Sequence, residues 1–213
     1  MITRLWSMLI FKTKYKSSSD ENLMHMIQKN DRYAFNELYD RYAHKLLHYF
    51  FRMLGGDEQK AQDFLQEICL KILQKPTQFD STAVVSTWIY TIAHNMCKNE
   101  YRRLNTKKEF LILGATQSPA IYSEDGLFLT ESRIDLELIT AAIWNEVDKL
   151  DHVRRSIFLL RFQAHLSIKD IATILNCTEG TVKSRLYYIT KYLAHKLKKL
   201  NPNNIEVQIN EQS

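Results

Sequence analysis

The sequence predicts an all-α protein with two small helical domains, an N-terminal helical bundle and a C-terminal helix-turn-helix domain, joined by a flexible linker. Its 213 residues include only five Gly and three Pro, too few for a turn-rich β-sandwich. Apolar residues recur at spacings of three and four over residues 20–103 and again from Ser132, which is typical of amphipathic helices. Residues 104–131 break this pattern with Gly114 and Pro119 and therefore predict the linker.

The N-terminal bundle is expected to hold four helices, because each apolar stretch lies between helix start and stop signals. Asp57 can cap the third helix. Gly55-Gly56 ends the second helix, and Pro76 closes the third. The expected ranges are 20–29, 32–54, 57–73 and 85–103, and the candidate caps of the first two are Ser19 or Asp20 and Asn30 or Asp31.

Four more helices are expected after the linker, and the last three have the start signals Asp151, Ser167 and Thr178. Their expected ranges are 132–149, 151–163, 167–175 and 179–199. The predicted organisation is an extension at 1–19, the bundle at 20–103, the linker at 104–131, the helix-turn-helix domain at 132–200 and a tail at 201–213. We expect the N-terminal extension to be loose, because its short apolar run cannot span a bilayer and no cleavage site follows it.

The net charge of +5 is distributed unevenly along the chain. Residues 93–108 hold five basic and one acidic residue, and residues 150–200 hold ten and three. The intervening residues 109–149 hold two basic and eight acidic residues. A solvated helix face is the more common cause of a single charge run. Two basic blocks, each beside a helical pattern, favour nucleic acid as the partner.

The cysteines and the absent motifs exclude several function classes. Cys69, Cys97 and Cys177 form no CxxC pair, which argues against a disulfide framework or a zinc site and for reduced thiols in a cytosolic protein. The sequence has no P-loop, GxSxG or HExxH, so neither an enzyme nor a cofactor is predicted. His44 and His48 have the spacing of metal ligands, but no supporting motif accompanies them, and we expect exposed or core histidines.

The sharpest local pattern is LSIKDIATILNCTEGTVKSRLYYI at 166–189. Ala172 is small enough for a second helix to cross closely, and Asn176 tolerates the positive φ that the turn requires. The outward positions of the second helix are Thr181, Lys183, Ser184, Arg185 and Tyr188. Apolar residues inside and cationic, hydrogen-bonding residues outside predict a recognition helix in the major groove. An ordinary helix hairpin in a larger core is the alternative.

Two helices of the N-terminal bundle carry polar faces. Asp63, Gln66 and Glu67 lie together on the third helix, where they suit docking to a basic protein partner or form a solvated surface. On the fourth helix, amides and cations interleave with aromatic rings; these residues are Asn95, Lys98, Asn99, Arg102 and Arg103, with Trp88, Tyr90 and Tyr101. Bases stack on rings while cations hold phosphates, so this face predicts single-stranded nucleic-acid binding. Trp88 as a core anchor is the alternative.

These segments, in this order, resemble sigma-70 family RNA polymerase sigma factors of the extracytoplasmic function (ECF) group. DFLQEICLKIL resembles the family's core-binding helix, D-x-x-Q-E-x-F, and STWIYTIAHNMCKNEYRR resembles its promoter-melting and −10 recognition helix. LSIKDIATILNCTEGTVKSRL resembles its −35 helix-turn-helix. The chain departs from the usual pattern at Leu150-Asp151, where relatives have Leu-Pro, at Asn176 for the turn glycine, and at Tyr188 and Thr190, where relatives often have arginine.

The resemblance implies a dissociable specificity subunit that binds core RNA polymerase, recognises the −10 and −35 elements and promotes DNA melting. It implies that Asp63, Gln66 and Glu67 bind the β′ clamp helices of the polymerase. It also implies that the C-terminal domain binds the β flap and the −35 element. The loop Lys75–Ser86 would hold a flipped −10 base, and the polar face of the fourth helix would hold the −10 strand. An anti-sigma factor is a further expected partner; a small-molecule substrate and stable membrane insertion are not expected.

Two other classes remain open from the residues alone. A dimeric helix-turn-helix regulator of closed duplex would need a sensor domain or a dimer seam in 20–103, and no heptad seam is visible there. A sigma-like decoy that sequesters an anti-sigma factor should have eroded nucleic-acid faces, whereas both basic blocks persist.

Overall fold

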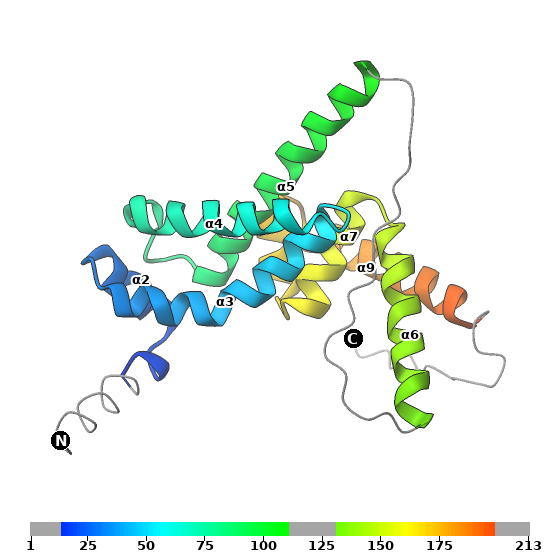
Figure 1. Cartoon of the computed structure of the whole chain (residues 1–213), viewed down its shortest axis with the longest axis horizontal. Helices are drawn as coiled ribbons and strands as arrows, with labels where there is room; N and C mark the ends of the chain where they lie inside the picture. The colour runs from blue at the N-terminus through cyan, green and yellow to red at the C-terminus, as the bar shows by residue number, and fades with distance from the viewer. Residues whose placement is uncertain (1–13, 111–130, 199–213) are drawn as a thin grey trace.

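The computed structural model describes residues 14–110 and 131–198, with side chains at 14–105 and 139–198. Within these ranges every regular element is helical (Figure 1). The elements are α2 (Asp20–Gln28), α3 (Arg32–Met53), α4 (Glu58–Gln74), the 3₁₀ turn η1 (Pro76–Gln78), α5 (Val85–Phe110), α6 (Glu131–Asp148), α7 (His152–Phe158), the π-helical turn η2 (Leu159–Gln163), α8 (Ile168–Leu175) and α9 (Glu179–Lys198). We call residues 14–110 the N-terminal unit and residues 131–198 the C-terminal unit.

Local signals set the helix ends as predicted. The side chains of Ser19, Asp31, Asp57, Asp151 and Ser167 each accept hydrogen bonds from backbone N–H groups in the first turn of the following helix. Gly55 and Gly56, which follow α3, both have positive φ, where glycine carries no steric cost. These contacts satisfy backbone groups that a helix terminus leaves unpaired.

The core of the N-terminal unit lies where α3 packs against α2, α4 and α5. Leu23, Leu38, Phe50, Ile68 and Ile89 are almost completely buried there. Phe50 makes an edge-to-face contact with Phe64 of α4, with ring centroids 5.5 Å apart. This core holds α4 and α5 against α3 and fixes which of their faces remain exposed.

Two boundaries differ from those expected. Tyr15 is buried, and the guanidinium of Arg41 donates to the carbonyls of Tyr15, Lys16 and Ser18, so residues 14–18 are tied to the bundle and are not part of a loose extension. Helix α5 continues to Phe110 and projects beyond the body of the molecule (Figure 1). The first residues assigned to the linker are therefore helical; residues 1–13 and 111–130 lie outside the described residues.

The two units pack against each other. Helix α5 contacts α8 and α7, and α3 contacts α7 and η2. Thr87 of α5 donates a hydrogen bond to Asp170 of α8 at 3.0 Å, and Arg52 of α3 pairs with Asp148 of α6 at 3.0 Å. The sequence led us to expect two units connected through a linker, and their direct contact is an additional feature of the structure.

Candidate polymerase and nucleic-acid interface

Helix α4 presents the predicted docking residues on one exposed face. Asp63, Gln66 and Glu67 are all exposed, while Leu65 and Ile68 point into the core. Asp63 accepts a hydrogen bond from Gln59 at 3.2 Å, and Glu67 pairs with Lys71 at 2.7 Å. Such exposed pairs hold their partners weakly, so both carboxylates can exchange them for cations on another protein.

The same face of α4 also carries exposed leucines that sequence reasoning missed. Leu70 is 51% exposed and Leu73 is 45% exposed. Leu70 lies three residues after Glu67 and Leu73 three after Leu70, a spacing that places neighbours on one helix face. The two leucines add a small exposed apolar area to the acidic face of α4. The spacing in the sequence could have revealed them.

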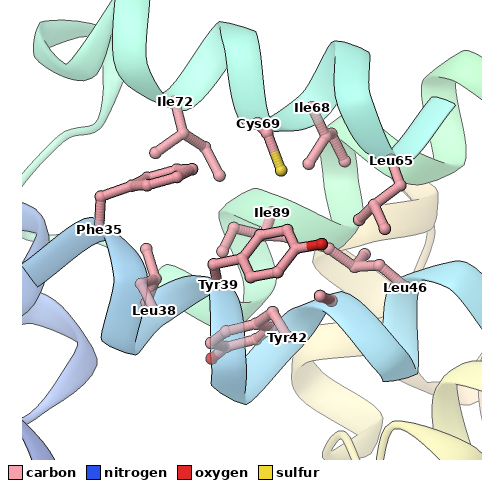
Figure 2. Close-up of a pocket in the computed structure, with 11 residues that line it drawn as sticks. Phe35, Leu38, Tyr39, Tyr42, Leu46, Leu65, Ile68, Cys69, Ile72 and Ile89 are labelled. Atoms are coloured by element: carbon pink, nitrogen blue, oxygen red, sulfur yellow. The ribbon is translucent and has the colours of Figure 1, made fainter. Parts of the chain in front are cut away.

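Behind this face, α4 and α3 enclose a narrow apolar crevice. Figure 2 shows Cys69 of α4 pointing into it, with Phe35 and Leu38 of α3 among the facing side chains. The crevice has a volume of about 10 Å³, enough for one water molecule at most. Burial raises the pKa of the Cys69 thiol. The crevice is therefore a packing imperfection of the core and is too small for a ligand.

Helix α5 keeps most of its predicted polar face in solvent. Asn95, Lys98, Asn99 and Arg102 are exposed and follow one another at helical spacing. Arg103, at the edge of this face, instead directs its guanidinium to the buried carboxylate of Glu100, with contacts of 2.7 and 2.6 Å. The face thus offers amides and cations for a nucleic-acid strand, and Arg103 is engaged within the protein.

An ion-pair cluster around the buried carboxylate of Glu100 fixes α5 against α4. Glu100 pairs with Arg103 and also with Lys60 of α4. The hydrogen bonds from Arg103, followed by those from Lys60, lower the pKa of Glu100 to about 2 against the opposing effect of burial. Glu100 is therefore ionised at neutral pH, and the acidic residue within the basic block has a structural role.

The aromatic residues of α5 have three different environments. Trp88 is half-buried and packs edge-to-face on Phe79 of the preceding loop, at 5.4 Å. Tyr101 stacks on His152 of α7, with ring centroids 4.3 Å apart. Tyr90 is buried against Tyr49 at 5.7 Å. The expectation that Tyr90 interleaves with the nucleic-acid face is wrong, because the ring lies on the core side of the helix.

The loop before α5 is held in place at both ends. Gln28 of α2 donates hydrogen bonds to the carbonyls of Pro76 and Phe79, at 3.1 and 3.4 Å. Glu21 accepts a hydrogen bond from the backbone N–H of Val85 at 3.3 Å. Between these anchors, polar residues including Asp80 remain exposed. The loop therefore presents a fixed polar edge beside Trp88.

The helix-turn-helix forms as predicted. Asn176 ends α8 in the left-handed region with φ 49°. The Thr178 side chain accepts a hydrogen bond from the backbone N–H of Thr181 at 3.2 Å, which caps α9. Val182 and Ile189 of α9 are buried against α8 and its neighbours.

The outward face of α9 carries the predicted residues and one more. Lys183, Ser184 and Tyr188 are exposed, whereas Thr181 and Arg185 are half-buried. Tyr187, which was not predicted, is 56% exposed and contacts Tyr188 edge-to-face at 5.5 Å. Lys191 places its ammonium 5.8 Å from the Tyr187 ring. This face combines hydroxyls, cations and rings, the groups that contact bases and phosphates.

The candidate metal pair does not form a metal site in the structure. His48 of α3 contacts the Trp144 ring edge-to-face at 5.4 Å and hydrogen-bonds Gln163. Within residues 14–110 and 131–198, no cluster of three His, Cys, Asp or Glu side chains has a geometry for a metal ion. Over the same ranges, no helix combines the length and hydropathy that crossing a bilayer requires.

Comparisons with known proteins match both helical units to one family. The family model of Sigma-70 region 2 matches residues 38–107, and that of Sigma-70 region 4 matches residues 140–188. The RNA polymerase sigma-H factor of Pseudomonas aeruginosa is 30% identical over 79% of this chain and 88% of its own length. The ECF RNA polymerase sigma factor SigW of Bacillus subtilis is 29% identical over 82% of this chain and 94% of its own.

Solved structures share the fold. The sigma factor RpoE of Bartonella quintana, in complex with the anti-sigma factor NepR, superposes with a TM-score of 0.64 at 21% identity, covering 77% of this chain and 96% of that one. CnrH, in complex with the cytosolic domain of CnrY, gives a TM-score of 0.60 at 19% identity over 85% and 99% of the two chains. With two family regions in order and relatives aligned over most of its length, this chain belongs to the ECF group of the sigma-70 family and is a promoter-recognising transcription initiation factor.

Proposed function

We propose that the chain is a dissociable specificity subunit of RNA polymerase, not an enzyme, and that it acts in the cytoplasm with the polymerase. The observation that carries the proposal is the presence of three distinct exposed faces in one chain. These are the acidic and leucine-bearing face of α4, the amide and cation face of α5, and the cationic outer face of α9. Each has the chemistry that one step of initiation requires.

The α4 face would dock on the β′ clamp helices of core polymerase. Asp63 and Glu67 supply negative charge, Gln66 supplies an amide, and Leu70 supplies apolar area. A central apolar contact with a charged rim is the usual build of a protein interface. The C-terminal unit would contact the β flap, which would position it upstream on the promoter.

The α5 face and the loop before it would hold the −10 strand. Lys98 and Arg102 would contact phosphates, while Asn95 and Asn99 would hydrogen-bond bases. Flipping a base out of the stack costs a few kcal/mol, so stacking and hydrogen bonds in the pocket must compensate for that loss. The anchored loop Lys75–Ser86, with the half-buried Trp88 ring at its edge, supplies fixed polar groups and an aromatic surface for this purpose.

Helix α9 would enter the major groove at the −35 element. Lys183, Ser184 and Tyr188 are exposed for contacts with DNA, and Tyr187 extends the same surface. Lys191 and Lys198 continue the positive charge along the helix. Because phosphate contacts position a protein and base contacts specify the sequence, we assign Lys191 and Lys198 to positioning.

An anti-sigma factor is the proposed regulatory partner. The solved relatives RpoE and CnrH were determined in complexes, the first with the anti-sigma factor NepR and the second with the cytosolic domain of CnrY, and the fold match to both supports a partner of the same kind.

Run-off transcription with purified core polymerase tests the proposed function. Genomic promoter fragments are transcribed with core alone and with core plus this chain, and the 5′ ends are mapped. We expect transcripts from defined start sites only when the chain is added. Core-independent DNA binding without such transcripts would favour a helix-turn-helix regulator, and neither activity would favour a decoy.

A further inference from the structure

The most outward side chains of α9 gather around two tyrosine rings. Val182, Ile189 and Leu193 are buried and mark the inner side of the helix. The exposed side chains most nearly opposite them lie three or four positions apart, which makes them neighbours on the helix surface. We call this set the tyrosine patch, and its members are Ser184, Tyr187, Tyr188 and Lys191.

The two rings of the tyrosine patch support each other. Tyr187 and Tyr188 meet edge-to-face, with ring centroids 5.5 Å apart and ring planes at 74°, an arrangement that aromatic pairs prefer. The Lys191 ammonium lies 5.8 Å from the centre of the Tyr187 ring, within the range of cation–π attraction. Tyr187 therefore contacts both Lys191 and Tyr188, and the Tyr188 ring stands in solvent beside a neighbour that restricts its motion before any partner binds.

The chemistry around Tyr188 favours apolar contact over paired hydrogen bonds. Bidentate reading of guanine or adenine uses an Arg, Lys, Asn or Gln side chain. Between Ser184 and Lys191 the chain has one such residue, Arg185, and it is half-buried. The Thr190 hydroxyl is turned back onto the helix, where it donates to the Leu186 and Tyr187 carbonyls at 3.1 and 3.0 Å. What this part of α9 offers to a base edge is therefore mainly ring surface.

One base carries an apolar group that fits such a surface. Among the base edges in the major groove, thymine alone presents a methyl group, on C5, and apolar or aromatic side chains contact it. Removing one such group from water favours binding by about fourfold. An exposed ring on a helix that enters the major groove can therefore distinguish thymine from the other three bases.

We propose that Tyr188, supported by Tyr187, is a specificity-determining residue of α9 and that its ring takes the C5-methyl group of a thymine in the −35 element. The proposal rests on the proposed function, since it names the base that the recognition helix reads. Lys191, at the end of the tyrosine patch, keeps the phosphate contact already assigned to it.

Replacing thymine with deoxyuridine tests the proposal, because deoxyuridine lacks only the C5-methyl group. The full chain is combined with core polymerase and bound to a promoter mapped by run-off transcription. Each thymine of the −35 element, on both strands, is replaced one at a time, and equilibrium binding is measured at one salt concentration. We expect one replacement to weaken binding by about fourfold in the wild type. A wild type that binds every replaced duplex as tightly as the unmodified one would overturn the proposal.

Three variants assign the effect to the Tyr188 ring. Tyr188→Ala removes the ring and should bind the thymine and deoxyuridine duplexes equally at that position. Tyr188→Phe keeps the ring without its hydroxyl and should retain the thymine preference. Tyr33→Ala removes an exposed ring of α3, distant in sequence from α9, and is the matched control. A thymine preference that survives in Tyr188→Ala would overturn the contact, and one lost equally in Tyr188→Phe would assign the reading to the hydroxyl instead.

A change of specificity gives a second readout. Tyr188→Arg supplies the guanidinium that reads guanine through its O6 and N7 atoms, so guanine should replace thymine as the preferred base at that position. An unchanged preference for thymine in this variant would contradict the assignment. If the wild type initiates transcription but no thymine depends on Tyr188, this inference is wrong and the proposed function stands. If the wild type fails to initiate transcription with core, both are wrong.

Discussion

Helices α5 and α9 are the two promoter-reading helices proposed here, and they are held in place by different means. Helix α5 is fixed by long-range contacts, because Glu100 binds Lys60, Tyr90 packs on Tyr49, and His94 meets Ser156. Helix α9 is capped locally by Thr178 and packs through an apolar stripe against α6, α7 and α8. Buried changes in α5 should therefore affect folding, whereas outward changes in α9 should affect DNA binding alone.

The largest expected effect concerns the core of the N-terminal unit, where α3 packs against α4. Phe50→Ala removes a fully buried ring that contacts Phe64 and should lower the free energy of unfolding by about 3–5 kcal/mol. Urea unfolding followed by circular dichroism measures this. Tyr188→Ala, which removes a ring that is 60% exposed on α9, is the control and should change stability little. Equal losses in both variants would remove the distinction between the buried core and the exposed face of α9.

The next effect concerns the buried carboxylate of α5. Glu100→Gln keeps the side-chain shape but removes the charge that Lys60 and Arg103 bind. We expect the free energy of unfolding to fall by only about 1–2 kcal/mol, because Lys60 and Arg103 are partly exposed and solvent screens their attraction to Glu100. Glu67→Gln removes the carboxylate of an exposed pair on α4 and should cost less than about 0.5 kcal/mol. If Glu100→Gln and Glu67→Gln lowered the free energy of unfolding equally, burial would not strengthen the ion pairs of Glu100.

A smaller effect is the pH dependence that His94 imposes. Burial, followed by the charges of Lys98 and His152, lowers the pKa of His94 from 6.5 to about 4. The unfolded chain therefore binds a proton at this residue that the folded chain excludes between pH 6.5 and 4. The stabilisation from keeping His94 neutral is complete above pH 6.5 and is lost as the pH falls. The free energy of unfolding should therefore decrease by about 1 kcal/mol between pH 7.5 and 5.5.

Three neighbouring groups bear on this test: Lys98 on α5 itself, His152 on α7, and Tyr49 of α3 beyond Ser156. The pKa of His152 is also lowered by burial, so part of the slope belongs to it. Urea unfolding of the wild type and of His94→Gln at the two pH values separates the part of the pH dependence that belongs to His94 from the part that belongs to other groups. The same slope in both proteins would assign the whole effect to other groups.

The smallest effect is expected on α9, in DNA binding and not in folding. Lys183→Ala removes an exposed cation and should reduce the salt dependence of −35 binding by about one released counterion, with unchanged stability. A salt titration of a −35 duplex with the full chain and core polymerase measures the slope. Glu179→Gln, an exposed change in the first turn of the same helix, controls for general charge effects. An unchanged slope for Lys183→Ala would exclude its phosphate contact.

The same contrast explains how much of the structure the sequence could predict. Helix ends were predictable because capping residues act within one turn, as at Asp31, Asp57 and Thr178. The left-handed conformation of Asn176 followed equally from its place in the turn. The three segments quoted for the family resemblance identified the family because each combines a buried apolar stripe with polar residues at recognisable helical spacing.

Contacts between distant residues were not predictable in this way. Ser156 lies 107 positions from Tyr49 and 62 from His94, and no periodicity in one segment indicates such a partner. Tyr90 was misplaced because an aromatic residue at the border of two helix faces suits either a core or a nucleic-acid surface. Arg103 was assigned to DNA because it falls on the outward face of α5, and only the fold shows it paired with the buried Glu100, which Lys60 of α4 also contacts.

Footprinting of a mapped promoter tests the central claim, that one chain reads two separated elements through α5 and α9, most directly. Hydroxyl-radical cleavage is measured with core polymerase alone, with the free chain, and with both together. We predict two protected patches about 25 base pairs apart, or about 85 Å of B-form DNA, only when core and chain are both present. A single protected patch formed by the free chain, unchanged by core, would contradict the account and indicate a closed-duplex regulator.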